Sequence, residues 1–169
     1  GKLDILAAYR SMVGFNYEPL AEVHKVKFTN AYINHTYLEG LPVEPVDTDW
    51  GGVLFYKQRM TNGAIVLFLS YETASWLGEG IWNKWVEMGA YNSEIGLPIG
   101  SEYIDANNND YPTVDFNNGR IYWNGSEAIP EIYLAYFAAN NTDGGAPFSV
   151  QFNDTSYILN GNVDSWLWD

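Results

Sequence analysis

Residues 96–121 read GLPIGSEYIDANNNDYPTVDFNNGRI, and this stretch sets the architecture that we expect for the chain. Two of its motifs, Gly-Leu-Pro at 96–98 and Asn-Gly at 118–119, occur 56 residues earlier at 40–42 and 62–63. An isoleucine two residues after each Asn-Gly pair repeats as well. Two motifs that keep one offset are typical of an internal repeat, which must be recognised before single elements are assigned.

Each copy predicts a helix, a glycine turn and a hairpin. Residues 81–88 carry an apolar stripe at helical spacing, and Gly89 is suited to end that helix. Pro98 then favours an extended segment. Apolar residues on both sides of 118–119 predict a hairpin turn there, as they do in the earlier copy. In that copy residues 64–69 are apolar throughout, which predicts a central buried strand.

The rest of the chain is less regular. We expect two further helices, at 3–13 and at 130–139, the second with Pro130 in its first turn. We also expect a C-terminal hairpin that joins 156–159 to 163–168. Gly-Ala-Pro at 145–147 stands where a third, degraded copy would begin.

These elements predict an α+β fold in which small helix-plus-β-hairpin repeats pack into one compact domain, 1–169. The expected units are an N-terminal cap or degenerate unit at 1–37, a first repeat at 38–78, a second repeat at 79–127, and a degenerate third unit with the C-terminal hairpin at 128–169.

Composition excludes several classes of protein. Hydrophobic residues make up 47% of the 169 residues, which excludes an intrinsically disordered chain. No run of about 18 apolar residues is present, so we expect no transmembrane helix. The N-terminus shows no basic-then-apolar leader. The absence of cysteine excludes disulfides and thiolate metal sites.

The chain is strongly acidic, with a formal net charge of −13. Residues 60–169 contain Lys84 and Arg120 as their only basic residues, against fourteen acidic ones. Such a surface repels a phosphate backbone and an anionic membrane. We therefore expect no nucleic-acid partner and no membrane insertion. Neutral ligands and cations are compatible with this charge.

Aromatic residues account for 17% of the chain, and asparagine is abundant beside them. Aromatic rings stack on the apolar face of a pyranose, while amides bind its hydroxyl groups. This composition points to a carbohydrate-binding face. The alternative is that the aromatic residues fill the core and the asparagines occupy turns.

Four motifs resemble the pattern of one LGFP repeat, namely IWNKW at 81–85, Gly89, EIGLP at 94–98 and FNNGRIYW at 116–123. The match extends over residues 79–127, with Leu97 at the position where the family has phenylalanine. Residues 38–66 match the pattern in part.

The resemblance implies a non-catalytic module of bacterial secreted and cell-envelope proteins. Such repeats are thought to anchor their carriers to the cell wall or its polysaccharide. On this basis we expect a protein that is secreted or at the cell surface and that binds a cell-wall or extracellular glycan.

Some aromatic residues are better ligand candidates than others. Trp85, Phe116 and Trp123 lie on periodic apolar stripes, where core packing is expected. The candidates for a sugar-stacking platform are Trp50, Tyr91, Tyr103 and Tyr111, which we expect in loops beside Gly, Asn and Asp, together with Trp82.

An Asp/Asn-rich segment is a candidate calcium loop, because Ca²⁺ takes six to eight oxygen ligands from such loops. Its candidate ligands are Asp105, Asn107, Asn109, Asp110 and Asp115. An EF-hand is excluded, because its sixth position is aspartate rather than glycine and its twelfth is phenylalanine. The alternative is a solvated turn without metal.

Two other functions stay open. A small glycoside hydrolase would use a pair of carboxylates drawn from Asp49, Glu79, Glu87, Glu102, Asp105 and Asp115. A structural or protein-interaction module would present the aromatic surface to a partner chain. The repeats favour binding over catalysis, so we assign no catalytic residues.

Overall fold

The computed structural model describes residues 21–44, 46–47, 55–69, 74–140, 143–145, 147 and 149–160. The described helices and strands are α2 (Glu22–Glu39), β1 (Phe55–Met60), β2 (Gly63–Phe68), β3 (Ser75–Gly78), α3 (Glu79–Glu87), the 3-10 helix η2 (Ala90–Asn92), β4 (Tyr103–Asp105), β5 (Tyr111–Phe116), β6 (Gly119–Trp123), β7 (Ala128–Leu134), β8 (Phe137–Ala139), β9 (Phe152–Asp154) and β10 (Tyr157–Leu159).

The expected α+β fold of helix-plus-hairpin repeats is wrong. The described residues form ten strands in three antiparallel sheets and only two α-helices, which is a β-rich fold. We name the three-stranded sheet β1-β2-β3 sheet 1, the five-stranded sheet β10-β7-β6-β5-β4 sheet 2, and the β8-β9 pair the arm. The error arose mainly at 130–139, where the two strands β7 and β8 replace the expected helix.

Residues 130–139 show why that helix does not form. They lie in β7 and β8, and Pro130 pairs with Ile121 of β6. Ala128 and Ile132 are buried against the core, while the residues between them are more exposed. The pairing of five consecutive residues of β7 with β6 selects the strand, because the sheet already offers an edge with which the segment can pair. The first-turn preference of proline for helices was outweighed by this tertiary pairing.

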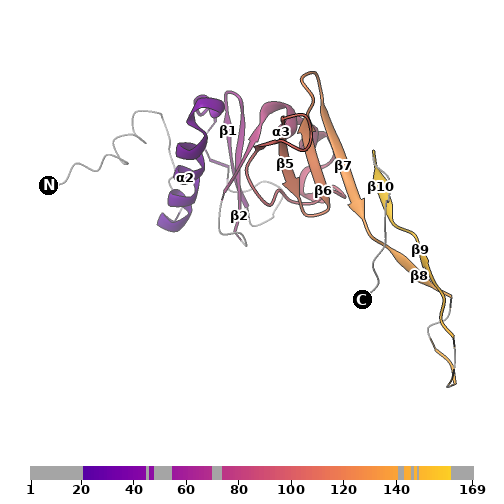
Figure 1. Cartoon of the computed structure of the whole chain (residues 1–169). Helices are drawn as coiled ribbons and strands as arrows, with labels where there is room; N and C mark the ends of the chain where they lie inside the picture. Colours follow the sequence, from indigo (N-terminus) through magenta and orange to yellow (C-terminus); the bar gives the residue numbers. More distant parts are fainter. Residues whose placement is uncertain are drawn as a thin grey trace.

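The layers follow one another in the order α2, sheet 1, α3 and sheet 2 (Figure 1). In sheet 1, β2 lies between β1 and β3, and each of its six residues is buried. The prediction of a central buried strand at 64–69 is therefore confirmed. One face of the sheet contacts α2, and the other contributes to the core around α3.

The central core lies between the two sheets, and Trp85 of α3 is at its centre. Trp85 is fully buried, and its Nε1 donates a hydrogen bond to the carbonyl oxygen of Gly96 at 3.0 Å. Its ring lies 5.7 Å from that of Trp82, 6.0 Å from that of Phe116 and 6.4 Å from that of Phe68, measured between centroids. The helix thus connects the core faces of the two sheets.

The predicted helix at 81–88 is confirmed as α3. Glu79 lies in its first turn and Lys84 in its last, each at the end where its charge favours the helix dipole. Three apolar side chains, Ile81, Trp82 and Trp85, are buried. Gly89 follows with a φ of 107°, a conformation that glycine adopts without the penalty of a Cβ atom.

The two Gly-Leu-Pro stretches make matching contacts. The N–H of Leu41 donates to Thr61 Oγ1 at 3.0 Å, and its carbonyl accepts the N–H of Thr61 at 2.8 Å. Leu97 makes the same pair of bonds with the Oδ1 and N–H of Asn117, at 2.9 and 3.0 Å. The 56-residue offset in the sequence is thus an offset between equivalent backbone positions. Both Asn-Gly hairpins are confirmed as β1-β2 and β5-β6.

Two other expected elements have different outcomes. The helix at 3–13 lies outside the described residues, as do 163–168 of the C-terminal hairpin. The other half of that hairpin, expected at 156–159, forms β10, which pairs with β7 in sheet 2. This pairing places β10 at the edge of sheet 2, next to β7, whose residues were predicted to form a helix.

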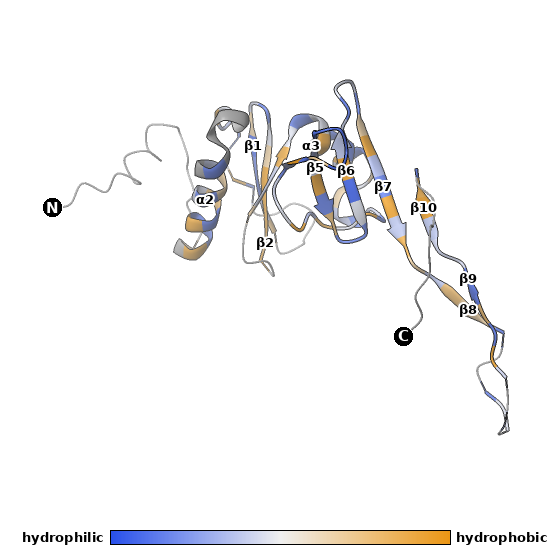
Figure 2. Ribbon diagram, viewed as in Figure 1, coloured by the Kyte–Doolittle hydropathy of each residue, from blue (hydrophilic) through white to orange (hydrophobic). Residues whose placement is uncertain are grey.

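Helix α2 was not predicted, and its sequence explains why. Figure 2 shows hydrophilic and hydrophobic residues interleaved along it, without a clear apolar stripe. Phe28, Ala31 and Tyr32 are nevertheless buried against sheet 1. On the same side, neither amide atom of the buried Gln58 has a hydrogen-bond partner in the described part of the chain. Apolar contacts of Phe28, Ala31 and Tyr32 with sheet 1 thus contribute to the packing of α2.

Candidate functional site

The outer face of sheet 2 gathers four tyrosines. Side chains alternate between the faces of a strand, and directly paired residues share a face. Val114 and Ile121 are paired and buried in the core, so their neighbours in sequence point outward. Three rows of paired residues share this outer side, namely Tyr103–Thr113–Tyr122, Asp105–Tyr111 and Asp115–Arg120–Glu131. Tyr133 lies two residues after Glu131 on the same strand and therefore points to the same side.

We call this surface the tyrosine face, made of Tyr103, Tyr111, Tyr122 and Tyr133 with the charged residues Asp105, Asp115, Arg120 and Glu131. The tyrosines come from β4, β5, β6 and β7 in turn. Neighbouring strands lie about 4.8 Å apart, so the four strands that carry the tyrosines span roughly 15 Å across the sheet. The surface is thus long enough to contact an extended ligand.

The tyrosine rings are partly open to solvent. The side chains of Tyr103 and Tyr133 are 41% and 44% exposed, and those of Tyr111 and Tyr122 are half-buried. The rings of Tyr111 and Tyr122 are parallel, with an interplanar angle of 1° and centroids 5.8 Å apart. They cover Thr113, which is fully buried although it lies on this face. The central pair is therefore held in a fixed orientation, and the outer two are accessible.

An ion-pair network fixes the polar groups between the rings. Arg120 is at its centre, with Nη1 2.9 Å from Asp105 Oδ2 and Nε 2.7 Å from Glu131 Oε2. Tyr133 Oη donates to the same Glu131 oxygen at 2.5 Å. Tyr103 Oη donates to Asp115 Oδ1 at 3.3 Å. These bonds set the positions of donors and acceptors before any ligand arrives, which lowers the entropy cost of binding.

The environment of the face raises the pKa values of Tyr103, Tyr122 and Tyr133. Burial raises the pKa of Tyr133 to about 12, and the hydrogen bond to Glu131 and the negative charge of that carboxylate add to the effect. Burial also raises the pKa values of Tyr103 and Tyr122. These side chains therefore remain neutral hydrogen-bonding groups well above neutral pH.

We expect replacement of Glu131 by glutamine to lower the pKa of Tyr133 from about 12 toward the ordinary value of about 10. The substitution removes the charge that opposes the phenolate. Because the folded-state pKa exceeds the unfolded one, the associated stability is complete below about pH 10 and is lost as the pH rises through about 12. Titration of the tyrosine ring carbons by NMR, with Tyr133→Phe for assignment, measures the shift. Glu94→Gln, an exposed glutamate away from the face, is the control; an unchanged Tyr133 titration in Glu131→Gln would contradict the expectation.

The candidate calcium loop folds as a tight turn after β4. Asp105 is buried, and its Oδ1 accepts the N–H of Asn107 at 2.9 Å. Its carbonyl accepts the N–H groups of Asn108 and Asp110, both at 3.0 Å. Its second carboxylate oxygen contacts Arg120, so Ca²⁺ would have to compete with that guanidinium. In the described segments no three acidic or histidine side chains form a metal-binding group. Calcium binding stays a prediction.

The structure brings some of the predicted calcium ligands together and separates others. Asn107, Asn109 and Asp110 are exposed in the turn, and the last two have positive φ values of 53° and 56°. Asp115 lies apart from the turn, on β5, beside Tyr103. Of the five predicted ligands, Asp105 alone is buried, and its carboxylate is paired with the guanidinium of Arg120.

The predicted stacking residues are also divided. Tyr103 and Tyr111 lie together on the tyrosine face, but the expectation that they lie in loops is wrong, because they are the first residues of strands β4 and β5. Tyr91 is half-buried against the core, with its ring 6.0 Å from that of Phe55. Trp82 is only 5% exposed, and the guanidinium of Arg59 lies 5.3 Å from its ring centroid. Trp50 lies outside the described residues, as does Asp49.

Sequence reasoning missed four members of the face: Tyr122, Tyr133, Arg120 and Glu131. The signal that could have found them is the alternation along 119–134, which becomes readable once 128–134 is treated as a strand. Arg120 and Tyr122 then share one side of β6, as Glu131 and Tyr133 share one side of β7.

Comparison with known proteins adds no assignment to this geometry. No protein-family model matches the chain, and no curated protein is similar enough to count as a match. The resemblance to LGFP repeats stays a prediction from the motifs of the sequence.

Within the described residues, neither α-helix combines the length and the apolar character that crossing a membrane requires.

Proposed function

We propose that this chain is a non-catalytic module that binds a cell-wall or extracellular polysaccharide through the tyrosine face. The observation that carries the proposal is the placement of four tyrosines on four neighbouring strands of one accessible sheet face. The same proposal puts the protein outside the cell or at its surface.

The chemistry of the face suits a neutral sugar chain. Phenol rings offer apolar surface to the C–H groups of pyranose rings, and their hydroxyl groups remain hydrogen-bonding partners. Asp115 and Glu131 can accept hydrogen bonds from sugar hydroxyls, and Arg120 can donate them. Three carboxylates against one guanidinium make the face acidic, which disfavours an anionic polysaccharide.

Co-sedimentation with insoluble cell-wall preparations and polysaccharides tests the proposal. Wild-type protein is expected to pellet in a saturable manner, without release of reducing sugar. The double variant Tyr103→Ala/Tyr133→Ala is expected to lose at least about tenfold in affinity, because stacking contributes about 1–3 kcal/mol per ring by analogy with nucleic-acid bases. Both side chains are substantially exposed, so the fold should survive.

The matched control is Tyr136→Ala/Tyr157→Ala, which removes two somewhat more exposed tyrosines that lie off the tyrosine face. It is expected to bind like wild type. Unchanged pelleting of the Tyr103/Tyr133 variant would contradict the proposed site, and pelleting on no matrix would contradict the proposed function. Repeating the experiment with Ca²⁺ and with EDTA tests the calcium prediction, since only a metal-dependent loop makes pelleting sensitive to EDTA.

The arm favours a second candidate function, protein interaction. Phe137 and Phe152 lie on β8 and β9, are 63% and 53% exposed, and contact each other edge to face at 5.6 Å. The arm extends away from the layered body (Figure 1). A solution mass that rises with protein concentration, without any glycan binding, would favour this function.

A further inference from the structure

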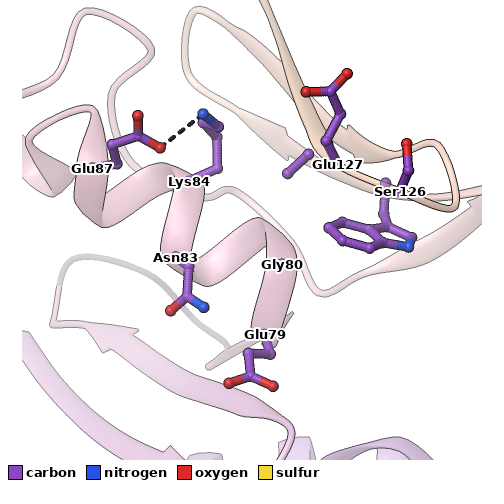
Figure 3. A pocket seen from close by; sticks show the side chains of 9 residues that line it. Glu79, Gly80, Asn83, Lys84, Glu87, Ser126 and Glu127 are labelled. Atoms are coloured by element: carbon purple, nitrogen blue, oxygen red, sulfur yellow. Dashed lines mark hydrogen bonds and ion pairs between the residues drawn. The ribbon is translucent and has the colours of Figure 1, made fainter.

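A groove separates α3 from the end of β6 and the start of β7 (Figure 3). Its volume is about 580 Å³, which is within the usual size of small-molecule sites. It lies on the core-facing side of sheet 2, at the helix, and shares no residue with the tyrosine face. A smaller pocket of about 200 Å³ adjoins it and shares Glu79, Gly80 and Trp123.

The helix side of the groove is a polar stripe. Glu79, Asn83 and Glu87 are spaced four residues apart, so they lie along one side of α3. The buried side chains of α3 point to the core instead. Lys84 also lines the groove, and its Nζ forms an ion pair with Glu87 Oε2 at 2.7 Å.

Trp123 forms the aromatic wall of the groove. It is half-buried and packs against the central core on one side. Gly80 of α3 contacts its six-membered ring so closely that a Cβ atom at Gly80 would lie 2.4 Å from Trp123 Cε3. The absence of that Cβ lets the helix rest on the indole and fixes the orientation of the ring. The groove thus has an aromatic surface that needs no rearrangement before binding.

The charges around the indole are unbalanced. Glu79, Glu87 and Glu127 line the groove, and Lys84 is the one cation that does so. Because Lys84 pairs with Glu87, the carboxylates of Glu79 and Glu127 have no cationic partner in the described residues. The other basic residue of the segment 60–169 is Arg120, and its guanidinium forms ion pairs with Asp105 and Glu131 in the tyrosine face. The groove therefore has a net negative charge of about two.

We propose that this groove is a second binding site, and that its ligand is a sugar residue with a free, protonated amine. The indole takes the apolar face of the pyranose and attracts its cation. The carboxylate of Glu79 or that of Glu127, which lie at opposite ends of the groove, pairs with the ammonium group, and the amide of Asn83 binds a hydroxyl. An acetylated sugar leaves both carboxylates without a counter-charge, and an acidic sugar is repelled.

Calorimetric titration with two short oligosaccharides of equal length tests this inference. One is a glucosamine oligomer with free amines, and the other is its N-acetylated counterpart. Wild-type protein is expected to bind the amine form at least tenfold more tightly. The double variant Glu79→Gln/Glu127→Gln is expected to lose most of that preference; both side chains are exposed, so the change leaves the core intact.

The control variant is Glu44→Gln/Glu94→Gln, which removes two exposed carboxylates elsewhere and leaves the same net charge. This control is needed because a chain of net charge −13 attracts any cation weakly. Equal affinity for the two oligomers would overturn the inference. An equal loss of preference in the two double variants would overturn it as well, since that result indicates general charge attraction.

The outcome is separable from that of the proposed function. Tyr103→Ala/Tyr133→Ala leaves the groove untouched and is expected to keep the preference for the amine form. If the tyrosine face binds no polysaccharide, the groove can still bind the amine sugar, and the converse also holds. Loss of the preference in the Tyr103/Tyr133 variant would place amine recognition on the tyrosine face and overturn the inference.

Discussion

Replacement of Gly119 by alanine is expected to destabilise the protein by at least about 3 kcal/mol. A Cβ atom at this position would lie 2.0 Å from the backbone oxygen of Glu131 and 3.0 Å from Ile132 Cα. Both contacts are with backbone, which cannot rotate away as a side chain can. The two strands β6 and β7 would have to separate where Gly119 pairs with Ile132. As the strands separate, the adjacent hydrogen bond from Tyr133 N–H to the carbonyl of Asn118, 2.7 Å long, would also be lost.

Urea unfolding followed by circular dichroism measures this loss, and Gly100→Ala is the matched control. Nothing lies within 4 Å of a Cβ atom at Gly100. That variant is expected to stay within about 0.5 kcal/mol of wild type or to gain slightly, because alanine restricts the unfolded chain. A cost below 1 kcal/mol for Gly119→Ala would show that β6 and β7 do not approach as closely as described.

Replacement of Trp85 by alanine is expected to cost about 3–5 kcal/mol, which is a large share of the stability of a domain this size. The indole is fully buried and contacts three other rings from α3 and both sheets. Its removal opens a cavity at the point where all three elements meet. The carbonyl of Gly96 also loses its hydrogen bond from Nε1.

Two further variants divide this cost into its parts. Trp85→Phe keeps an aromatic ring but not the hydrogen-bond donor, so its free energy of unfolding is expected to lie between those of wild type and Trp85→Ala. Val86→Ala changes the next residue of α3, which is exposed, and is expected to stay within about 0.5 kcal/mol of wild type. Thermal and urea unfolding measure all three. Equal stabilities of Trp85→Ala and Val86→Ala would contradict the central position of Trp85.

Local sequence signals predicted those elements whose information lies in a single segment. The helical stripe at 81–88 and Gly89 define α3, and the uninterrupted apolar run at 64–69 defines β2. The overall class was predicted incorrectly, because it depends on pairing between distant segments. Pro130 is suitable for the first turn of a helix, and only the pairing of its segment with β6, which includes Ile121 opposite Pro130, selects the strand.

The same limit applies to the candidate site. Tyr103 and Tyr111 were predicted because they flank an Asp/Asn-rich turn, and they lie on the tyrosine face. The composition could not show that Trp82 faces the core or that Arg120 occupies the carboxylate of Asp105. Those facts depend on which side of a helix or strand meets its neighbour, which is set by tertiary packing. Glu79 and Glu127 likewise line one groove only through the contact of α3 with sheet 2.

The order of the strands has a consequence for how the chain folds. In β1-β2-β3 and in β4-β5-β6-β7, each strand pairs with the next along the chain, so each ladder closes a short loop and loses little chain entropy. Strand β10 pairs with β7 in the same register in which β9 pairs with β8, so β7-β8 and β9-β10 form the two sides of one long hairpin. Every ladder can therefore form from contacts local in sequence, and β10 can close onto β7 as a continuation of the arm. Because β10 lies at an edge of sheet 2, it can also leave together with β9 without breaking the β4-β5-β6-β7 ladders.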